Sequence, residues 1–256
     1  IGDRTFWRAF KNTLVLNISY LLVRFPLTLI FALLLNEIKA LWWKKFVQTV
    51  SYLPHFISMV IVTGMIRELI STNGPLNHLI MNMGGEAISF IAYPQYFSSI
   101  FVISGVWQAL GWGTILYLAA IAGINPSLYE AAEVDGANRY QTFFRITIPC
   151  IKTMLLFTLV TSLIGGLNMF DIPKLFITQS GPDNATLTTN VFIYDQAFAG
   201  GYLYNRASAA SMIMFVIIVV CSALLFFTMR DKDEAALKKQ AKLAKKQAKL
   251  AAKGAN

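Results

Sequence analysis

Charged side chains are scarce in this sequence, and cysteine and histidine are scarcer still. Asp, Glu, Lys and Arg make up only 14% of the 256 residues, whereas a typical soluble domain carries about 25%. Cys150, Cys221, His55 and His78 show no spacing of a metal site or a disulfide framework. No nucleophile and base stand at a catalytic spacing either. These absences argue against a metal centre and against an enzyme.

The net charge of +9 is unevenly distributed along the chain. Residues 230–256 carry nine Lys/Arg and three Asp/Glu, so this tail holds +6 of the total. A nucleic-acid-binding protein would place basic residues and aromatics together on a folded domain. Here the aromatics lie in apolar runs, so no nucleic-acid partner is expected. The tail repeats KKQAKLA, and is either a solvated helix or a segment attracted to anionic membrane lipid.

Long apolar runs are abundant, and hydrophobic residues make up 56% of the chain. About 20 helical residues cross the hydrocarbon core of a bilayer. The sequence therefore predicts an all-α integral membrane protein with a transmembrane domain over residues 1–229 and a basic tail over residues 230–256. A short interfacial helix is expected between residues 67 and 95, and none is assigned to residues 171–206. The predicted spans are five, at about residues 12–35, 46–66 (kinked at Pro54), 96–122, 151–170 and 207–229.

The distribution of Lys and Arg predicts the orientation of these spans. Cytoplasmic loops are enriched in Lys and Arg, and the tail and the segment NEIKALWWKK are the richest in them. Both lie on one side of five spans, together with the polar segment between the third and fourth spans. We therefore expect these parts in the cytoplasm. The chain would then start outside, and we expect one missing upstream helix, which would give six spans with both termini inside.

A polar segment, SLYEAAEVDGANRYQTFFRI, follows the third span. Asn125 or Ser127 can cap a helix there, and Pro126 suits a first helical turn. We predict two short helices over about residues 126–146, broken at Gly136. The first helix is expected to present a small-residue surface to a partner protein, formed by Glu130, Ala131 and Ala132. The second is expected to pack an apolar face on the membrane helices, formed by Phe143, Phe144 and Ile146. From these residues alone, an interfacial connector without a partner is equally open.

The spacing of this segment resembles the EAA motif found in permease subunits of binding-protein-dependent ABC importers. Glu130-Ala131-Ala132 is followed by Gly136, Ile146 and Pro149, with Ile148 where the motif usually has Leu.

The resemblance extends over nearly the whole chain, from about Thr5 to Phe227. VQTVSYLPHFIS, GWGTILYLAAIAGINPSLYEAAEVDGA and FITQSGPDNATLTTNVFIYDQAF resemble permeases of the maltose and multiple-sugar group, including permeases for oligosaccharides. Thr178–Pro182 resembles that group's T-x-G-G-P loop, with Ser180 in place of one Gly.

The resemblance implies a type I importer permease in a bacterial inner or plasma membrane, with cytoplasmic coupling helices. Its expected partners are a second, similar permease, two ATPase subunits, an extracytoplasmic sugar-binding protein and membrane lipid. ATP and Mg would be bound by the ATPase, because this chain contains no GxxxxGK[ST] phosphate-binding loop. The residues expected to couple to the ATPase are Glu130, Ala131, Ala132, Asp135, Gly136 and Arg139.

Polar and aromatic residues at membrane depth are the candidates for the substrate path, since sugars need hydrogen bonds and stacking surfaces. They are Asn168, Trp107, Trp112, Tyr117 and Asp171, with Gln108 and Arg24 nearby. Each has another interpretation. Trp107 and Trp112 suit the aromatic belts at membrane interfaces, and Asn168 can bond a neighbouring helix. Asp171 can be a solvated or capping residue, and Arg24 can snorkel or pair with a partner subunit.

The predicted function is transport of a carbohydrate, with an oligosaccharide favoured. An ABC permease for another solute is one alternative, and the Gly-Pro loop argues against it. A secondary transporter or channel is another, but neither an inverted repeat nor a pair of broken helices is evident.

Overall fold

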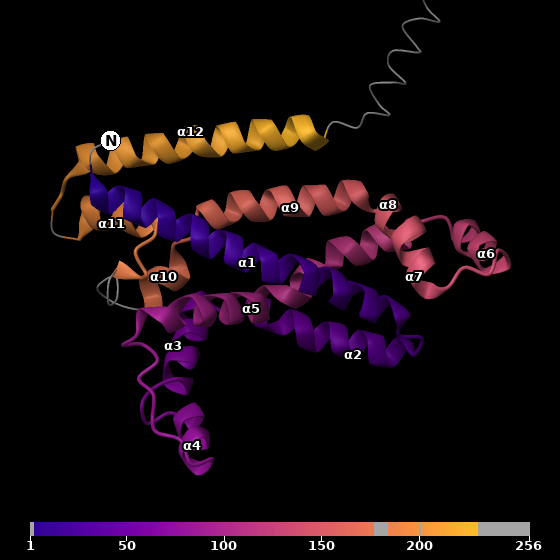
Figure 1. Cartoon of the computed structure of the whole chain (residues 1–256), viewed down its shortest axis with the longest axis horizontal. Coiled ribbons are helices and arrows are strands. Elements are labelled where there is room, and N and C mark those ends of the chain that lie inside the picture. Colours follow the sequence, from indigo (N-terminus) through magenta and orange to yellow (C-terminus); the bar gives the residue numbers. More distant parts are fainter. Residues whose placement is uncertain (1–2, 177–183, 200, 230–256) are drawn as a thin grey trace, which may run out of the picture.

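The computed structural model describes residues 3–176, 184–199 and 201–229, and within these ranges the regular structure is helical (Figure 1). The Thr178–Pro182 motif and the basic tail lie outside the described residues. The elements are α1 (Arg4–Glu37), α2 (Leu41–Tyr52), η1 (Leu53–Phe56), α3 (Met59–Leu69), α4 (Pro75–Asn82), α5 (Pro94–Ala122), α6 (Pro126–Val134), α7 (Arg139–Thr142), η2 (Phe143–Thr147), α8 (Ile148–Cys150), α9 (Lys152–Leu167), α10 (Asp171–Phe176), α11 (Thr189–Phe198) and α12 (Tyr204–Met229).

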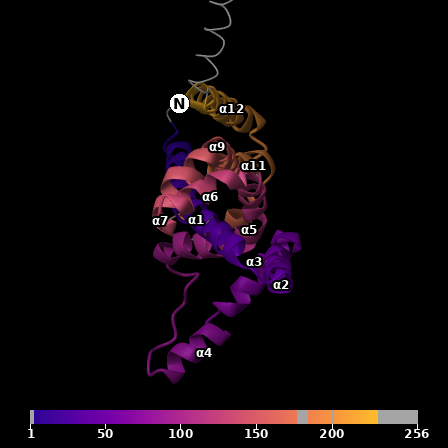
Figure 2. The same cartoon turned by 90° about the vertical axis from the view of Figure 1, so that its right-hand side faces the viewer.

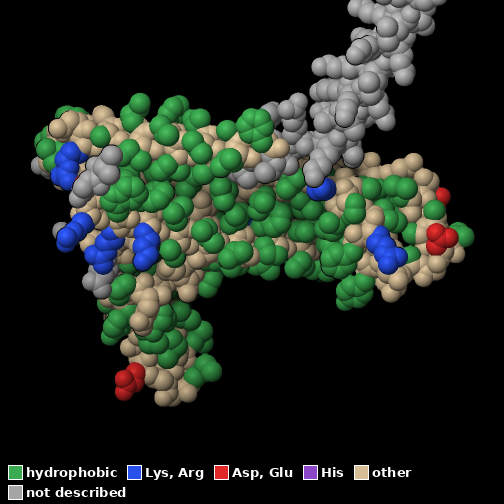
Figure 3. All heavy atoms as spheres, turned by 45° about the horizontal axis from the view of Figure 1, so that its top comes forward, with side chains coloured by type: hydrophobic (Ala, Val, Ile, Leu, Met, Phe, Trp, Pro, Cys, Tyr) green, Lys and Arg blue, Asp and Glu red, His purple; other side chains and the backbone are tan. Residues whose placement is uncertain are grey.

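The predicted all-α membrane architecture is confirmed. Four helical segments of the described chain are long and apolar enough to cross a bilayer, namely α1, α5, α9 with α10, and α12, and a bent pair makes a fifth candidate. Four of the five predicted spans coincide with these helices. Hydrophobic side chains cover the middle of the visible surface, whereas charged ones gather towards its two ends and the tip near α4 (Figure 3). This distribution suits a lipid environment around the middle of the molecule.

The predicted second span, residues 46–66, is broken and not merely kinked. Helices α2 and η1 meet α3 at an angle of 97°, and Pro54 lies in the short 3₁₀ turn η1. Proline has no N–H to donate and disfavours a helical residue before it. The break also frees backbone carbonyls, and Gln108 Nε2 donates to one of them, Ile57 O, at 3.3 Å. Figure 2 shows α3 and α4 extending away from the other helices.

Residues 171–206 are more regular than we predicted, because they contain both α10 and α11. Helix α11 packs against α1 and α12, and α10 against α3. Thr189 explains part of this order: its backbone N–H donates to Thr13 Oγ1 at 2.9 Å, and the two threonine hydroxyls lie 3.0 Å apart. The short interfacial helix expected between residues 67 and 95 is present as α4. The buried Asn77 side chain holds it to the following loop through Ile88.

Helix α1 is the helix around which the others pack, since it contacts α5, α9, α11 and α2. Its approach to α9 depends on Gly166, where a Cβ would overlap the Asn17 carboxamide. Asn17 is buried, and its Nδ2 donates to Leu163 O at 2.8 Å. Small residues of this kind let helices approach closely in membranes, where side-chain hydrogen bonds add to the packing.

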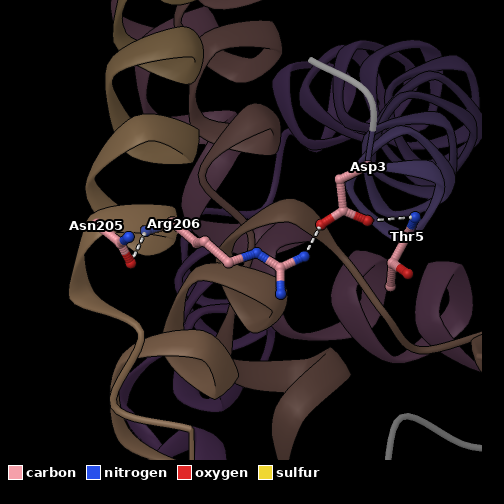
Figure 4. A network of polar contacts seen from close by, with 4 residues as sticks. All are labelled: Asp3, Thr5, Asn205 and Arg206. Atoms are coloured by element: carbon pink, nitrogen blue, oxygen red, sulfur yellow. Dashed lines mark hydrogen bonds and ion pairs between the residues drawn. The ribbon is translucent and has the colours of Figure 1, made fainter.

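The beginning of α1 is tied to the beginning of α12 by Asp3 and Arg206 (Figure 4). Asp3 also caps α1 by accepting a hydrogen bond from Thr5 N at 2.9 Å. Burial by itself would raise the pKa of Asp3, but Thr5 N and the Arg206 guanidinium outweigh it and hold that pKa below its usual value. The ionised Asp3 carboxylate therefore stabilises the folded state at pH values above its unfolded-state pKa. This stabilisation is lost as pH falls through the lower pKa that Asp3 has in the folded state.

The loops separate into two groups at opposite ends of the molecule. Figure 1 places the N-terminus, α4, α10 and α11 towards one end, and α6, α7, the α1–α2 connection and the last turn of α12 towards the other. This grouping matches the alternation predicted from the sequence. The two ends of the described chain therefore lie on opposite sides of the helical layer.

We expect Gly166→Ala to destabilise the protein by about 1–3 kcal/mol, because the new methyl group overlaps Asn17 in a packed interface. Gly165→Ala is the matched control, since a Cβ there meets nothing within 4 Å and Ala favours the helix. Thermal unfolding midpoints of the two purified variants in the same detergent would test this. Equal midpoints would contradict the role given to the α1–α9 contact.

Candidate functional site

A cavity of about 470 Å³ lies among α1, α3, α5, α9 and α10. Its polar lining comes from the second half of α9 and the residue after it, and from α1, α5 and α10: Tyr20, Arg24, Gln108, Thr161, Ser162, Asn168 and Asp171. Apolar and aromatic groups such as Phe101 and Phe170 complete the wall. Hydrogen-bonding groups and aromatic surfaces therefore face the same space at membrane depth, which suits a polar organic ligand.

A second hollow of about 370 Å³ adjoins the first along α1. The two hollows share Arg24, Thr161 and Ser162 in their linings. The second is also lined by Trp112 and Tyr117. Together they form a discontinuous path along the faces of α1, α5 and α9.

The predicted substrate-path residues fall into three places. Asn168 and Asp171 line the first hollow, and both are exposed. Trp112 and Tyr117 line the second. Trp107 lines neither, and instead borders an apolar pocket of about 440 Å³ between α3 and α5.

Two of these aromatic residues already have partners within the chain. The Tyr117 side chain is only 2% exposed, and its hydroxyl lies 2.7 Å from Thr158 Oγ1. The Trp112 ring stacks on His55 with 4.6 Å between centroids. Asn168 Nδ2 donates to Ile164 O of its own helix at 3.3 Å. Tyr117 thus acts mainly in the α5–α9 contact, whereas Trp112 and Asn168 keep exposed surface towards the path.

Sequence reasoning missed Tyr20, Thr161 and Ser162 as lining residues. The signal was available, because each interrupts an apolar run with a hydroxyl group. What the sequence could not give was the direction in which each side chain points.

The polar segment after the third span forms the two short helices that we predicted. Asn125 Oδ1 accepts from Ser127 N at 3.1 Å and caps α6. Gly136 breaks the chain with a φ of +71°. Ala137 N donates to Ala132 O at 2.9 Å and Gly136 N to Glu133 O at 3.0 Å, which is the double bond of a Schellman motif. This backbone geometry fixes the angle at which α6 leaves α5 and turns back towards α7.

The second short helix passes into α9 without a loop. Asn138 and Gln141 form a reciprocal capping box at the start of α7. The π-helical turn η2 and then α8 follow directly, before α9 begins at Lys152. Tyr129 on α6 approaches this segment, with its hydroxyl 3.1 Å from Thr147 Oγ1. Helix α6 is therefore braced against η2, the turn that leads through α8 into α9.

The predicted coupling residues lie mostly on the outer surface of this segment. Glu130, Ala131, Asp135 and Gly136 are exposed, as is Arg139, whose Nη1 lies 3.4 Å from Glu37 Oε2. Ala132 is different, since it lies on the buried face of α6. The small-residue surface that we predicted therefore consists of Ala131 beside Glu130, while Ala132 packs inward.

The predicted inward packing of Phe144 is also wrong. Phe144 is 64% exposed, whereas Phe143 and Ile146 are partly buried. Val134 and Tyr140 are exposed as well, at 88% and 78%. The extra residue in a π-helical turn changes which side chains face inward. Exposed apolar residues at this end suit contact with another protein.

Comparison with known proteins places the chain in a described family. The sequence profile of the family described as "Binding-protein-dependent transport system inner membrane component" matches residues 8–235.

Two curated proteins illustrate the similarity. The polygalacturonan/rhamnogalacturonan transport system permease protein YteP of Bacillus subtilis is 43% identical over 159 residues, which cover 62% of this chain and 50% of YteP. This chain thus spans about half the length of that relative. The lactose transport system permease protein LacF of Rhizobium radiobacter is 32% identical over 234 residues, covering 90% of this chain and 78% of LacF.

A solved structure has a similar fold. It is a bacterial ABC transporter involved in the import of the acidic polysaccharide alginate. Its chain is 36% identical with a TM-score of 0.84, and the match covers 90% of this chain and 80% of that one. A second structure of the alginate transporter, in complex with an alginate pentasaccharide-bound periplasmic protein, matches equally well.

We expect Gly136→Ala to loosen α6 and α7, because a non-glycine residue at positive φ costs about 1–2 kcal/mol. A Cβ at Gly136 meets nothing within 4 Å, so the effect is purely one of backbone conformation. Hydrogen–deuterium exchange over residues 126–142 should speed up about tenfold. Gly123→Ala is the control, since its φ is −82° and its Cβ makes ordinary contacts. Equal exchange in both variants would contradict the prediction.

Proposed function

The chain belongs to the family of binding-protein-dependent transport system inner membrane components, and on this basis we propose that it forms the translocation path of an ATP-driven importer for a carbohydrate, with an oligosaccharide as the favoured substrate. As a member of that family it is a transport subunit and not an enzyme. Its helical fold is that of the type I importer permeases.

The observation that carries the proposal is the polar-lined cavity among the spans. Gln108, Thr161, Ser162 and Asn168 bring hydrogen-bonding groups to one space of about 470 Å³. Trp112 and Tyr20 add aromatic surfaces in the two adjoining hollows. Sugars present hydroxyl groups and apolar ring faces, and this lining complements both. Polar groups that face lipid are costly, so the convergence of these side chains on one space is best explained by a polar substrate that passes through it.

The names of similar proteins support a carbohydrate over other solutes. YteP is named for polygalacturonan and rhamnogalacturonan, LacF for lactose, and the solved transporter for alginate. These substrates belong to those proteins. Their shared chemistry is that of saccharides, which favours a sugar or oligosaccharide for this chain over an amino acid or phosphate.

We further propose that α6 and α7 dock on the ATPase and transmit its movement. Glu130 offers an exposed carboxylate beside the small Ala131, and Asp135 and Arg139 add charges of both signs. The exposed Val134, Tyr140 and Phe144 supply apolar area around them. An exposed patch of this composition at a loop end resembles a docking surface more than a solvated connector. The EAA spacing in this segment points the same way.

The proposed assembly contains a second permease, two ATPase subunits and an extracytoplasmic binding protein. The α6–α7 end and the tail would face the cytoplasm, and the end with α4, α10 and α11 would receive the binding protein. The cavity is open in this chain alone, so a second permease would complete its wall. A matching solved assembly contains a saccharide-bound periplasmic protein, which supports the last of these partners.

A secondary transporter or channel remains the alternative from another class. It would need no ATPase, and so it would take up substrate when the ATPase subunit is absent. In cells or vesicles that lack the ATPase gene product, we expect sugar uptake to fall to background. Uptake at the full rate in that strain would overturn the importer proposal.

We expect Glu130→Ala to weaken the binding of the ATPase to the permease by about thirtyfold, because truncating one partner of a buried interfacial charge pair commonly costs about 2 kcal/mol or more. The amount of ATPase that co-purifies with the permease should fall accordingly. Glu86→Ala is the matched control, since Glu86 is exposed on the α4 side, away from the docking surface. Both variants should have the same unfolding midpoint. If they retain ATPase equally, Glu130 is not part of the docking surface.

A further inference from the structure

Arg24 is a charged residue near the middle of a membrane-spanning helix. Helix α1 has 34 residues. Because an α-helix rises about 1.5 Å per residue, Arg24 lies about 5 Å along the axis from the midpoint of α1. The hydrocarbon core is about 30 Å thick, so this position lies within it when the helix is centred. Ionisable residues at this depth are costly and mark functional sites.

The guanidinium of Arg24 has a defined seat between α1 and α5. Its central carbon lies 5.4 Å from the centroid of the Tyr20 ring. On the other side is Gly113, where an added Cβ would lie 3.8 Å from Arg24 Nη2. The aromatic face attracts the cation, and the missing side chain at Gly113 leaves room for it. The arginine is thus positioned by its surroundings and does not simply extend towards the membrane surface.

No carboxylate of the described residues pairs with Arg24. The ion pairs among the described residues join Arg139 to Glu37, Lys174 to Asp195 and Arg206 to Asp3. Among the described residues, Asp171 is the one acidic residue that lines either hollow, and it lies exposed at the first turn of α10, beyond ion-pair distance of Arg24. Within the part of the chain that the structure describes, the positive charge at membrane depth therefore has no counter-charge.

Arg24 also lies where the two hollows meet, since it lines both of them together with Thr161 and Ser162. A ligand moving from one hollow to the other must pass its donors. A guanidinium binds a carboxylate through two parallel hydrogen bonds, and such charge-assisted bonds are strong where water is scarce.

We propose that Arg24 determines specificity for anionic saccharides, binding the carboxylate of a uronic acid unit as it passes between the two hollows. This inference rests on the proposed transport function and narrows its substrate class. The competing source of a carboxylate is the second permease, where Arg24 would make an intersubunit ion pair. The open space on both sides of Arg24 favours the passing ligand.

The test uses the complete importer, reconstituted in vesicles with its partner permease, ATPase and binding protein. ATP-dependent uptake of trigalacturonate and of neutral maltotriose is measured for the wild type, Arg24→Gln, Arg24→Lys and Arg8→Gln. Arg8 is an exposed arginine of the same helix that lines neither hollow, which makes it the matched control. Co-purified subunits and unfolding midpoints are recorded for every variant.

We expect the wild type to prefer trigalacturonate, and Arg24→Gln to reduce its uptake about tenfold. Trigalacturonate uptake by Arg24→Lys should lie between these two values, because lysine keeps the charge but cannot form the two parallel hydrogen bonds of a guanidinium. Uptake by Arg8→Gln should match that of the wild type. Assembly and unfolding midpoints should not change. A loss of the second permease in Arg24→Gln would assign the arginine to an intersubunit pair and overturn the inference.

Two further outcomes separate the inference from the function beneath it. If the wild type imports maltotriose in preference to trigalacturonate, or if Arg24→Gln slows both equally, the specificity assigned to Arg24 is wrong while the importer function stands. If the wild type imports neither sugar with ATP, this inference fails, and the proposed function fails with it when other oligosaccharides are not imported either.

Discussion

The structure depends on one constraint: backbone N–H and C=O groups within lipid must find partners inside the protein. Long uninterrupted helices meet it along α1, α5 and α12. Where the helical pattern stops, a side chain from elsewhere takes over, as Gln108 does at Ile57. Thr13 does the same at the beginning of α11 by accepting from Thr189 N. At both of these places the missing partner comes from α1 or α5, which agrees with the central position of these two helices.

A continuous helical segment links the two proposed functional regions. From Arg139 to Leu167 the chain is helical or turning without a long loop, through α7, η2, α8 and α9. One end of this segment carries the exposed residues of the proposed docking surface, and the other ends at Asn168 in the cavity wall. A displacement of α6 and α7 would therefore reach the cavity through α9 itself. Tyr129 and Thr147 brace the first part of this route, and Tyr117 and Thr158 the second.

Most of the fold could be predicted from run length and composition, because a span of apolar residues has few alternatives in a membrane. The predicted Gly136 break and Asn125 cap were confirmed for a similar reason, as both depend on local chemistry. The break at Pro54 was underestimated because its sharpness depends on Gln108, 51 positions away. Helix α11 was missed because Thr189, its first residue, finds its hydrogen-bond partner in Thr13 of α1, which is 176 positions away in the sequence. The inward position of Ala132 and the exposure of Phe144 depend on tertiary packing, which no local pattern records.

The π-helical turn at Phe143–Thr147 has a geometric consequence for the route from docking surface to cavity. Such a turn holds one residue more than an α-helical turn, and each residue rotates a helix by about 100°. The extra residue therefore rotates the side chains of α9, such as Thr161 and Ser162, by one residue's turn about the helix axis relative to the side chains of α7. One inserted position thus sets the rotation of the cavity-facing side chains of α9 relative to the exposed side chains of α7. Deleting one residue of the turn would rotate one set against the other without removing any side chain of either set.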